Sequence, residues 1–264
     1  MPITTAAPIH WMDQDAFHKV DYQLRGIAFD IHNEFGRFFD EKIYQEELVR
    51  RGRLRGLAMI PEFRITVALE GFRKDYLADC MVDHGVIIET KTVNSFSPSH
   101  RGQALNYLFL CGLNHGALFN FRSEQLQHEF ISTKLTLDAR RQFHLRADGF
   151  TPLSPACESI PDWLRRIFAE WGTHLDPALY RDALLHFLGG ATDLTSIHSD
   201  GSMLGHQSMP IFSKGLALSV TASVRQPELV AEHQRRLLKH TALRGIQWIN
   251  LHHETIELRT IEHS

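Results

Sequence analysis

Apolar residues recur at helical spacing near the start of the chain, at Leu24, Ile27, Ala28, Ile31, Phe35, Phe38 and Phe39. This i, i+3, i+4, i+7 spacing predicts an amphipathic helix. Gly36 interrupts the pattern, which resumes at Ile43 and Tyr44 and continues to Gly52. Because glycine breaks helices readily, we predict two helical segments with a break or kink between them.

The next segment has the two-residue alternation and the β-branched content of strands. Residues 62–69 alternate polar and apolar side chains, residues 72–81 are extended and bulky, and residues 85–93 form a short β-branched run. Asp83-His84-Gly85 supplies residues that tolerate the positive φ of a tight hairpin turn. Three successive strands are therefore predicted, the last two joined as a hairpin.

A second helix and a fourth strand follow. Ser97-Pro98-Ser99 is a helix start, and an apolar face runs from Ala104 to Cys111 before Gly112 ends the pattern. Residues 116–121 (GALFNF) are typical of a buried strand. The predicted order is helix, three strands, helix, strand, which makes this part of the chain an α/β fold.

The pattern changes beyond about residue 140. A Pro/Ser-rich connection over residues 151–161 precedes two predicted helices, 162–171 and 177–188, and a Gly/Ser-rich stretch covers residues 189–205. An extended segment near 216–224, a helix over 228–243 and a hairpin of 246–251 with 255–261 complete the chain. We predict two domains, residues 1–145 and an accessory α+β module over residues 146–264 with no assigned role.

Composition narrows the functional classes. The 264 residues include 28 Lys and Arg against 31 Asp and Glu, a net charge of -3. This balance argues against a protein that coats nucleic acid by bulk attraction, so a nucleic-acid function would need a local basic surface. The longest nearly uncharged apolar run, residues 104–113, is half the ~20 residues of a membrane-spanning helix. With three scattered cysteines and no leader-like start, we expect a cytoplasmic protein without membrane association.

Two carboxylates and an amine are predicted to converge on the hairpin. Asp79 and Glu89 can reach the same end of the same face, and Glu89 and Lys91 point the same way because they lie two apart on one strand. Mg²⁺ takes oxygen ligands from one or two carboxylates plus substrate phosphate. An acid followed by ExK is common by chance, but Ile87-Ile88 places Glu89 inside an apolar strand, where an unpaired carboxylate is costly. The pattern predicts a metal-dependent phosphodiesterase site.

The following helix carries Gln103 and Tyr107 on one face. Gln103 could fix a metal-bound water or a phosphate. Tyr107 has two equally supported interpretations, a hydrogen bond to a phosphate oxygen or half-buried packing.

Together these residues resemble a known nuclease family. Gly36, Glu41 and Tyr44, followed by Asp79, Glu89-Thr-Lys91 and Gln103-xxx-Tyr107, are similar to the GxxExxY group of the PD-(D/E)xK nuclease superfamily over residues 21–135. The Gln-xxx-Tyr element also resembles the RecB-type branch. The resemblance implies a restriction-endonuclease-like core, with Asp79, Glu89 and Glu41 as metal ligands for Mg²⁺ or Mn²⁺. It further implies Lys91 as the catalytic lysine, with Gln103 and Tyr107 supporting it.

Two departures from the family pattern stand out. The spacing from Gly36 to Glu41 is two residues longer than the motif, and Ala78 replaces the usual proline before Asp79. His32 is a further candidate for the metal site, although a lone helical histidine more often caps or packs. His198, Asp200 and His206 are better explained as turn chemistry than as a metal cluster.

The candidate nucleic-acid contacts lie near the second helical segment, at Arg50, Arg51, Arg53, Arg55 and Lys74. An arginine-rich helix end can equally serve to complement the helix dipole. We predict a metal-dependent nuclease acting on DNA in preference to RNA. The alternative is a catalytically idle nuclease fold used for nucleic-acid binding or assembly, with the C-terminal module as a homodimer or partner-protein surface.

Overall fold

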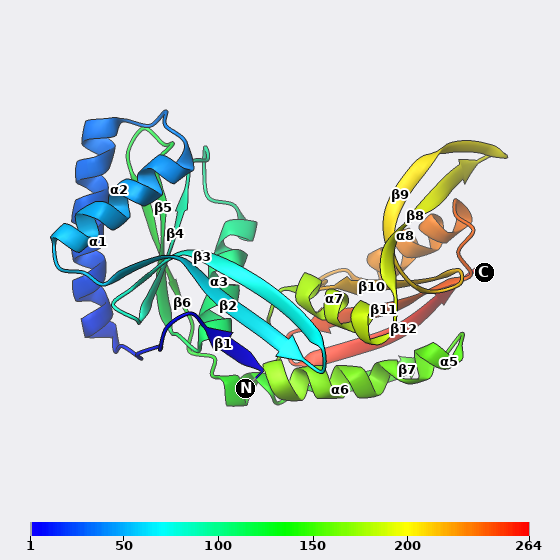
Figure 1. Cartoon of the computed structure of the whole chain (residues 1–264). Coiled ribbons are helices and arrows are strands. Elements are labelled where there is room, and N and C mark those ends of the chain that lie inside the picture. The colour runs from blue at the N-terminus through cyan, green and yellow to red at the C-terminus, as the bar shows by residue number, and fades with distance from the viewer. Residues whose placement is uncertain (1, 264) are drawn as a thin grey trace. The chain divides into compact units, whose positions relative to one another are not determined.

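The computed structural model describes residues 2–263 and divides the chain into two compact units, with the boundary between Leu137 and Asp138 (Figure 1). Each unit contains one six-stranded sheet with helices packed on it. The mixed α/β class predicted from the sequence is confirmed. No helix among the described residues is both long and apolar enough to cross a membrane.

The N-terminal unit contains β1 (Ile3–Thr5), α1 (Gln14–Phe35), α2 (Glu41–Leu54), β2 (Met59–Leu69), β3 (Phe72–Val82), β4 (Val86–Lys91), α3 (Pro98–Cys111), β5 (His115–Asn120) and β6 (Gln127–Ser132). The strands lie in the order β1-β2-β3-β4-β5-β6. β4 and β5 are parallel, with α3 connecting them, and the other neighbours are antiparallel. The predicted helices and four strands are present, and β1 and β6 are additional.

Local sequence signals explain where α1 begins and ends. The Asp13 side chain accepts a hydrogen bond from the Ala16 N–H at 2.8 Å, so α1 starts ten residues before the predicted Leu24. Gly36, with φ of 68°, ends the helix at the predicted break. Its conformation is one that glycine adopts without steric cost.

The β3–β4 turn uses positive φ at Asp83 (45°) and His84 (59°). Gly85 serves a different purpose, because a Cβ there would lie 2.6 Å from the His10 carbonyl oxygen. The turn therefore needs Gly85 so that the N-terminal segment can approach closely.

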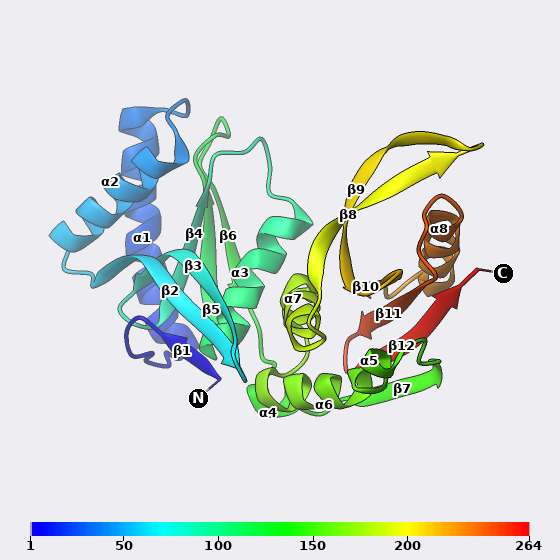
Figure 2. The same cartoon turned by 45° about the vertical axis from the view of Figure 1, so that its right-hand side comes forward.

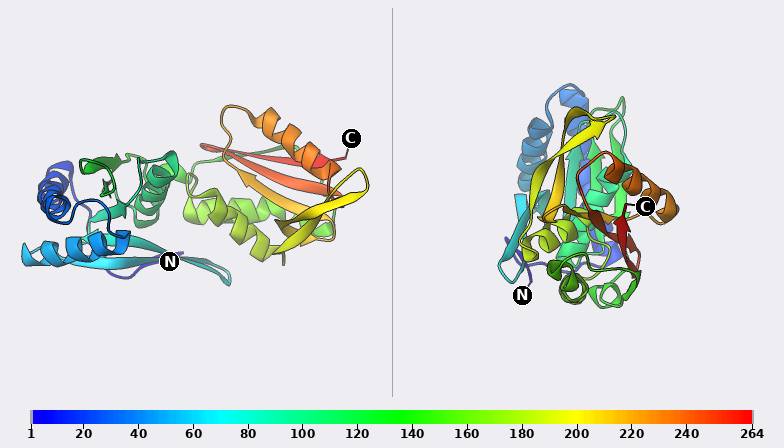
Figure 3. Two further views of the ribbon diagram at one scale, coloured as in Figure 1. Left: turned by 90° about the horizontal axis from the view of Figure 1, so that it is seen from above. Right: turned by 90° about the vertical axis from the view of Figure 1, so that its right-hand side faces the viewer.

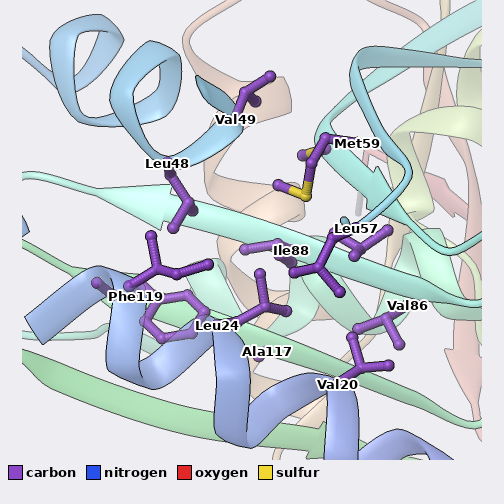
Figure 4. Close-up of a cluster of buried hydrophobic side chains, with 14 of the residues drawn as sticks. Val20, Leu24, Leu48, Val49, Leu57, Met59, Val86, Ile88, Ala117 and Phe119 are labelled. Carbon is purple, nitrogen blue, oxygen red and sulfur yellow. The ribbon is translucent and has the colours of Figure 1, made fainter. Parts of the chain in front are cut away.

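The main core of this unit lies between its sheet and the pair α1 and α2. Figure 4 shows part of this cluster, in which Leu24 and Leu48 from the helices face Ile88 and Phe119 from the strands. Helix α3 covers the opposite face of the sheet (Figure 2). Because successive strand residues alternate faces, Glu89, next to Ile88, points away from this cluster.

The C-terminal unit contains β7 (His144–Gly149), α5 (Pro155–Glu158), α6 (Ile160–Trp171), α7 (Pro177–Phe187), β8 (Ala191–Ser199), β9 (Ser202–Ser213), β10 (Leu216–Thr221), α8 (Pro227–Lys239), β11 (Gly245–His252) and β12 (Thr255–Glu262), with the short α4 (Leu137–Arg140) at the boundary. Its strand order is β7-β12-β11-β10-β9-β8. Helix α8 connects the parallel strands β10 and β11 and packs on one face, with α6 and α7 on the other (Figure 3).

The predicted domain boundary needs correction, and the structure adds two strands that were not predicted. The predicted domain boundary after residue 145 falls inside β7, which pairs with β12 and therefore belongs to the second unit. The Gly/Ser-rich stretch at 189–205 contains β8 and the start of β9, which form a long antiparallel hairpin. Asp200 and Gly201 turn it with φ of 48° and 77°, in agreement with the turn interpretation.

Candidate active site

The two predicted carboxylates come together at the open end of the β3–β4 hairpin. The last strand pair there is Cys80 with Ile88, and Asp79 and Glu89 follow it on the two strands. The Asp79 N–H donates to Glu89 Oε1 at 3.0 Å, and the Thr90 N–H donates to Asp79 Oδ2 at 2.7 Å. Side-chain oxygens thus accept the hydrogen bonds that backbone carbonyls would otherwise take. Both carboxylates are fixed by the backbone of the opposite strand.

The other neighbour of Asp79 is strained. Pro61 pairs with Cys80 and Phe63 pairs with Ala78, so Glu62 lies opposite Asp79. Glu62 has φ of 49°, a left-handed conformation inside a strand. Such conformations cost on the order of 1 kcal/mol in a non-glycine residue and are common at functional sites. The strand ladder is therefore irregular on both sides of Asp79.

Lys91 completes the predicted trio. Its Nζ donates to Glu89 Oε2 at 3.1 Å and lies 3.8 Å from Asp79 Oδ2. Burial alone would lower the pKa of Lys91, but Glu89, Asp79 and Glu41 outweigh burial and raise it. Lys91 is therefore an ammonium group at neutral pH.

Glu89 is the most deeply buried of the site carboxylates, with 1% of its side chain exposed. Burial raises the pKa of Glu89 to about 7, and the adjacent Asp79 carboxylate adds to the rise. Lys91 offsets only part of this effect. A carboxylate kept near its titration point by burial and a like charge favours a cation close by.

Glu41 joins the site from α2, where it is the first residue of the helix. Its Oε2 accepts a hydrogen bond from the Thr92 N–H at 3.0 Å, directly after Lys91. Burial raises the pKa of Glu41, with Lys91 acting in the opposite direction. The start of α2 is thus tied to the strand end that carries Lys91.

Gln103 and Tyr107 approach from α3. Gln103 Nε2 donates to Tyr107 Oη at 3.2 Å, and Tyr107 Oη donates to the Leu77 carbonyl at 3.2 Å. Burial raises the pKa of Tyr107, and the Glu89 charge raises it further. The hydroxyl of this buried tyrosine therefore holds β3 two residues before Asp79, while Gln103 lies exposed beside it.

The oxygen-rich donor set fits a hard divalent cation. Asp79, Glu89 and Glu41 bring three carboxylates against one ammonium group, Lys91. Mg²⁺ needs only one or two protein carboxylates and keeps several waters. Within residues 2–263, however, no group of three His, Cys, Asp or Glu side chains has the geometry to hold a metal ion. The arrangement therefore suits an ion held mainly by Asp79 and Glu89, with Glu41 at the edge of the site.

Most of the predicted basic contacts are engaged in ion pairs. Arg50 and Arg51 both donate to Glu47, at 2.6 Å and 2.5 Å, and Arg51 also binds Glu34. Arg55 donates to Asp30 at 2.6 Å. These three arginines are largely neutralised within the unit, which reduces the local positive charge expected from the sequence.

The other two basic residues have different environments. Arg53 donates to the Met59 carbonyl at 3.0 Å, and none of the described carboxylates forms an ion pair with it. The Lys74 Nζ lies 5.4 Å from the centre of the Tyr76 ring on β3.

Two residues that position the site were not assigned a role from the sequence. Thr90 occupies the variable position of ExK, yet its hydroxyl donates to Asp79 Oδ2 at 2.9 Å. Asn120 does have a signal, as a polar residue in an apolar strand. Its Nδ2 donates to the Val93 carbonyl at 2.7 Å, which fixes the segment after Lys91.

The weaker histidine candidate is accounted for by other contacts. His32 Nε2 lies 3.1 Å from the Ser123 carbonyl and serves the packing of α1.

One comparison with known proteins found a match, and it lies within the N-terminal unit. Residues 18–133 match the model of the PD-(D/E)XK nuclease superfamily, a segment that contains Glu41, Asp79, Glu89, Lys91 and Tyr107. Neither the curated proteins nor the solved structures provided a match. The family match covers less than half of the chain and lies within the N-terminal unit. It supports membership of this part of the chain in the PD-(D/E)XK nuclease superfamily and suggests a nuclease.

Proposed function

We propose that this protein is a Mg²⁺- or Mn²⁺-dependent nuclease that hydrolyses phosphodiester bonds in DNA. The observation that carries the proposal is the hydrogen-bonded cluster of Asp79, Glu89 and Lys91 at one strand end. No folding requirement calls for these charges together, because burying them without a partner is costly. The GxxExxY subgroup is proposed on Glu41 and on Tyr44, whose hydroxyl donates to the Gly36 carbonyl at 2.8 Å.

Each site residue has a proposed role. Asp79 and Glu89 hold the divalent ion, and Glu41 fixes the strand end through Thr92. When bound, such an ion supplies Lewis-acid polarisation of the phosphate and a more acidic water. The Lys91 ammonium offsets negative charge that develops on the phosphoryl oxygens. Gln103 and Tyr107 keep α3 and β3 in register around this centre.

The test is a cleavage panel over single-stranded, double-stranded, flapped and circular DNA, with RNA alongside, in Mg²⁺, Mn²⁺ or EDTA. We expect metal-dependent cleavage of at least one DNA form and a loss of about 100-fold or more in Lys91→Ala. The control is Arg101→Ala, which removes an exposed ion pair between Arg101 on α3 and Glu129 on β6. Equal cleavage by Lys91→Ala and the wild type would reject the assigned site.

A catalytically idle nuclease fold is the second candidate. It is favoured by the lack of a three-residue metal group among the described residues. Calorimetric titration with Mn²⁺ separates the two functions, since the nuclease proposal expects binding that Asp79→Asn weakens. If the wild type binds no Mn²⁺ and cleaves nothing, the idle fold is the better account.

The C-terminal unit is proposed as a homodimer or partner-protein surface. The β8–β9 hairpin supports this role because Leu194, Met203 and Leu204 on it are 64%, 59% and 68% exposed. Large exposed apolar side chains on one hairpin are candidates for an interaction surface. Light scattering after size exclusion would detect self-association. The homodimer is rejected if the wild type is a monomer and Leu204→Ser has the same mass.

A further inference from the structure

A groove runs along α2 toward the candidate active site. It has a volume of about 580 Å³ and is bounded by α2, the start of β2 and Asp79. Its walls include three apolar residues, Val49, Leu54 and Pro61. Leu54, the last residue of α2, is 74% exposed. An apolar wall that remains accessible to solvent beside a charged site is suited to the flat face of a ligand.

Among the described residues that line the groove, Arg53 is the cation that forms no ion pair, and the exposed carboxylate of Glu46 lies in the same lining. Lys42 binds Glu62 at 2.8 Å and Arg50 binds Glu47, so both are paired. Arg53 lines the same groove and donates to the neutral Met59 carbonyl, and no carboxylate within residues 2–263 forms an ion pair with it. The groove therefore offers the Arg53 guanidinium to an anion, and its lining also includes Asp79 of the candidate site.

We infer that this groove binds an unpaired nucleotide of a DNA strand next to the phosphodiester that is cleaved. This inference rests on the proposed nuclease function. Arg53 contacts a phosphate of that strand, and the base lies against Val49, Leu54 and Pro61. In a duplex the base faces are stacked inside, so only an unpaired base can contact such a wall. The preferred substrate is accordingly single-stranded DNA or a frayed or flapped end.

The experiment measures binding by fluorescence anisotropy, in the Lys91→Ala background that prevents cleavage. The probes are a labelled single-stranded oligonucleotide, its blunt duplex and an RNA of the same sequence, each over a range of salt concentrations. The test variants are Arg53→Gln and Leu54→Ser. Arg165→Gln is the control, because Arg165 is an exposed arginine on α6, outside the groove, that pairs with Asp162. Thermal melting checks that each variant is folded.

We expect both test variants to weaken single-strand binding about fivefold or more, with the control unchanged. Arg53→Gln should also reduce the slope of log affinity against log salt by about 0.7, since one phosphate contact is lost. Leu54→Ser should lower affinity without changing that slope. Duplex binding should be weaker and insensitive to Leu54→Ser.

The inference is overturned if both variants bind the single strand like the wild type, or if duplex binding falls equally. The DNA assignment is overturned if RNA binds as tightly as DNA and both test variants lose the same affinity for RNA as for DNA. These results are separate from the nuclease proposal, which fails when the chain with Lys91 intact cleaves no nucleic acid. The nuclease proposal can therefore hold while the groove assignment fails.

Discussion

The position of the Asp79 carboxylate depends on the residue between Glu89 and Lys91. Thr90 is 1% exposed, and both its N–H and its hydroxyl donate to Asp79 Oδ2. These two bonds fix one carboxylate oxygen and orient the other. A hydrogen bond to a charged group is worth about 1.5–3 kcal/mol, so the hydroxyl alone can set the orientation of this proposed ligand.

We predict that Thr90→Val lowers kcat about tenfold and raises the metal concentration needed for half-maximal activity. Valine preserves the shape and the backbone N–H but removes the hydroxyl donor. Thr90→Ser, which keeps the hydroxyl, should remain within about threefold of the wild type. Steady-state kinetics over a Mg²⁺ titration checks both variants, and identical kinetics in Thr90→Val would show that the backbone bond suffices.

Single residues were predictable from the sequence where their chemistry was unusual for their surroundings. Asp79, Glu89 and Lys91 could be expected to converge because the hairpin length places Asp79 beside Glu89, and Lys91 lies two residues after Glu89 on the same face. Glu62 and Thr90 could not be identified in advance. Glu62 has a left-handed φ, and Thr90 donates to a side chain on the opposite strand. Both features depend on three-dimensional packing and leave no pattern in residue type.

At the scale of elements, α2 is held to α1 by the buried Tyr44 side chain and an ion-pair network. Tyr44 donates to the Gly36 carbonyl, accepts from the Phe39 N–H at 3.2 Å and stacks on Phe121 at 4.5 Å. Within α2, Glu47 forms ion pairs with both Arg50 and Arg51, and Arg51 also pairs with Glu34 on α1. Because α2 carries Glu41, this network also positions one side of the candidate site.

We predict that Glu47→Gln lowers the free energy of unfolding by about 1 kcal/mol at pH 7. Hydrogen bonds from Arg50, and then Arg51, lower the pKa of Glu47 from 4.5 to about 2 against the opposing effect of burial. The stabilisation is therefore complete above pH 4.5 and is lost as the pH falls toward 2. The expected loss in the free energy of unfolding is only about 1 kcal/mol because Arg50 is 60% exposed and solvent screens its charge.

Urea unfolding of the wild type and Glu47→Gln at pH 7 and at pH 3 measures this difference. The difference should be smaller at pH 3 than at pH 7, because Glu47 is then protonated in the unfolded chain but still mostly charged in the folded one. Glu46→Gln, at the neighbouring exposed position, is the control and should match the wild type at both values. A difference that stays constant with pH would show that Glu47 acts through packing and not through its charge.

The elements recovered from the sequence share a clear apolar period. α6, α7, β11 and β12 lie close to their predicted ranges because their apolar residues recur at the spacing of a helix or a strand. β8 and most of β9 were missed, since their residues are largely exposed and have no apolar alternation to detect. Their pairing depends on the hairpin turn at Asp200-Gly201 and on the neighbouring strand β10. The residue pattern within either strand alone does not reveal these partners.

At the scale of the whole molecule, each unit has a hydrophobic core of its own. One cluster runs from Phe17 to Leu126, within the N-terminal unit. Another runs from Met209 to Ile261, within the C-terminal unit. Each six-stranded sheet is likewise built entirely from one unit. Separate cores and sheets are what independent folding requires.

We therefore predict that a fragment ending at Leu137 unfolds in one cooperative urea transition. Its sheet, core and proposed site residues, from Glu41 to Tyr107, all precede that position. It should also keep metal-dependent cleavage of short single-stranded DNA within about tenfold of the full chain, because the proposed chemistry uses no residue beyond it. Circular dichroism and cleavage kinetics check the two expectations separately. A cooperative but inactive fragment would assign a direct role in substrate binding to the C-terminal unit. A fragment without a cooperative transition would show instead that the N-terminal core depends on residues after Leu137, and that the units are not independent.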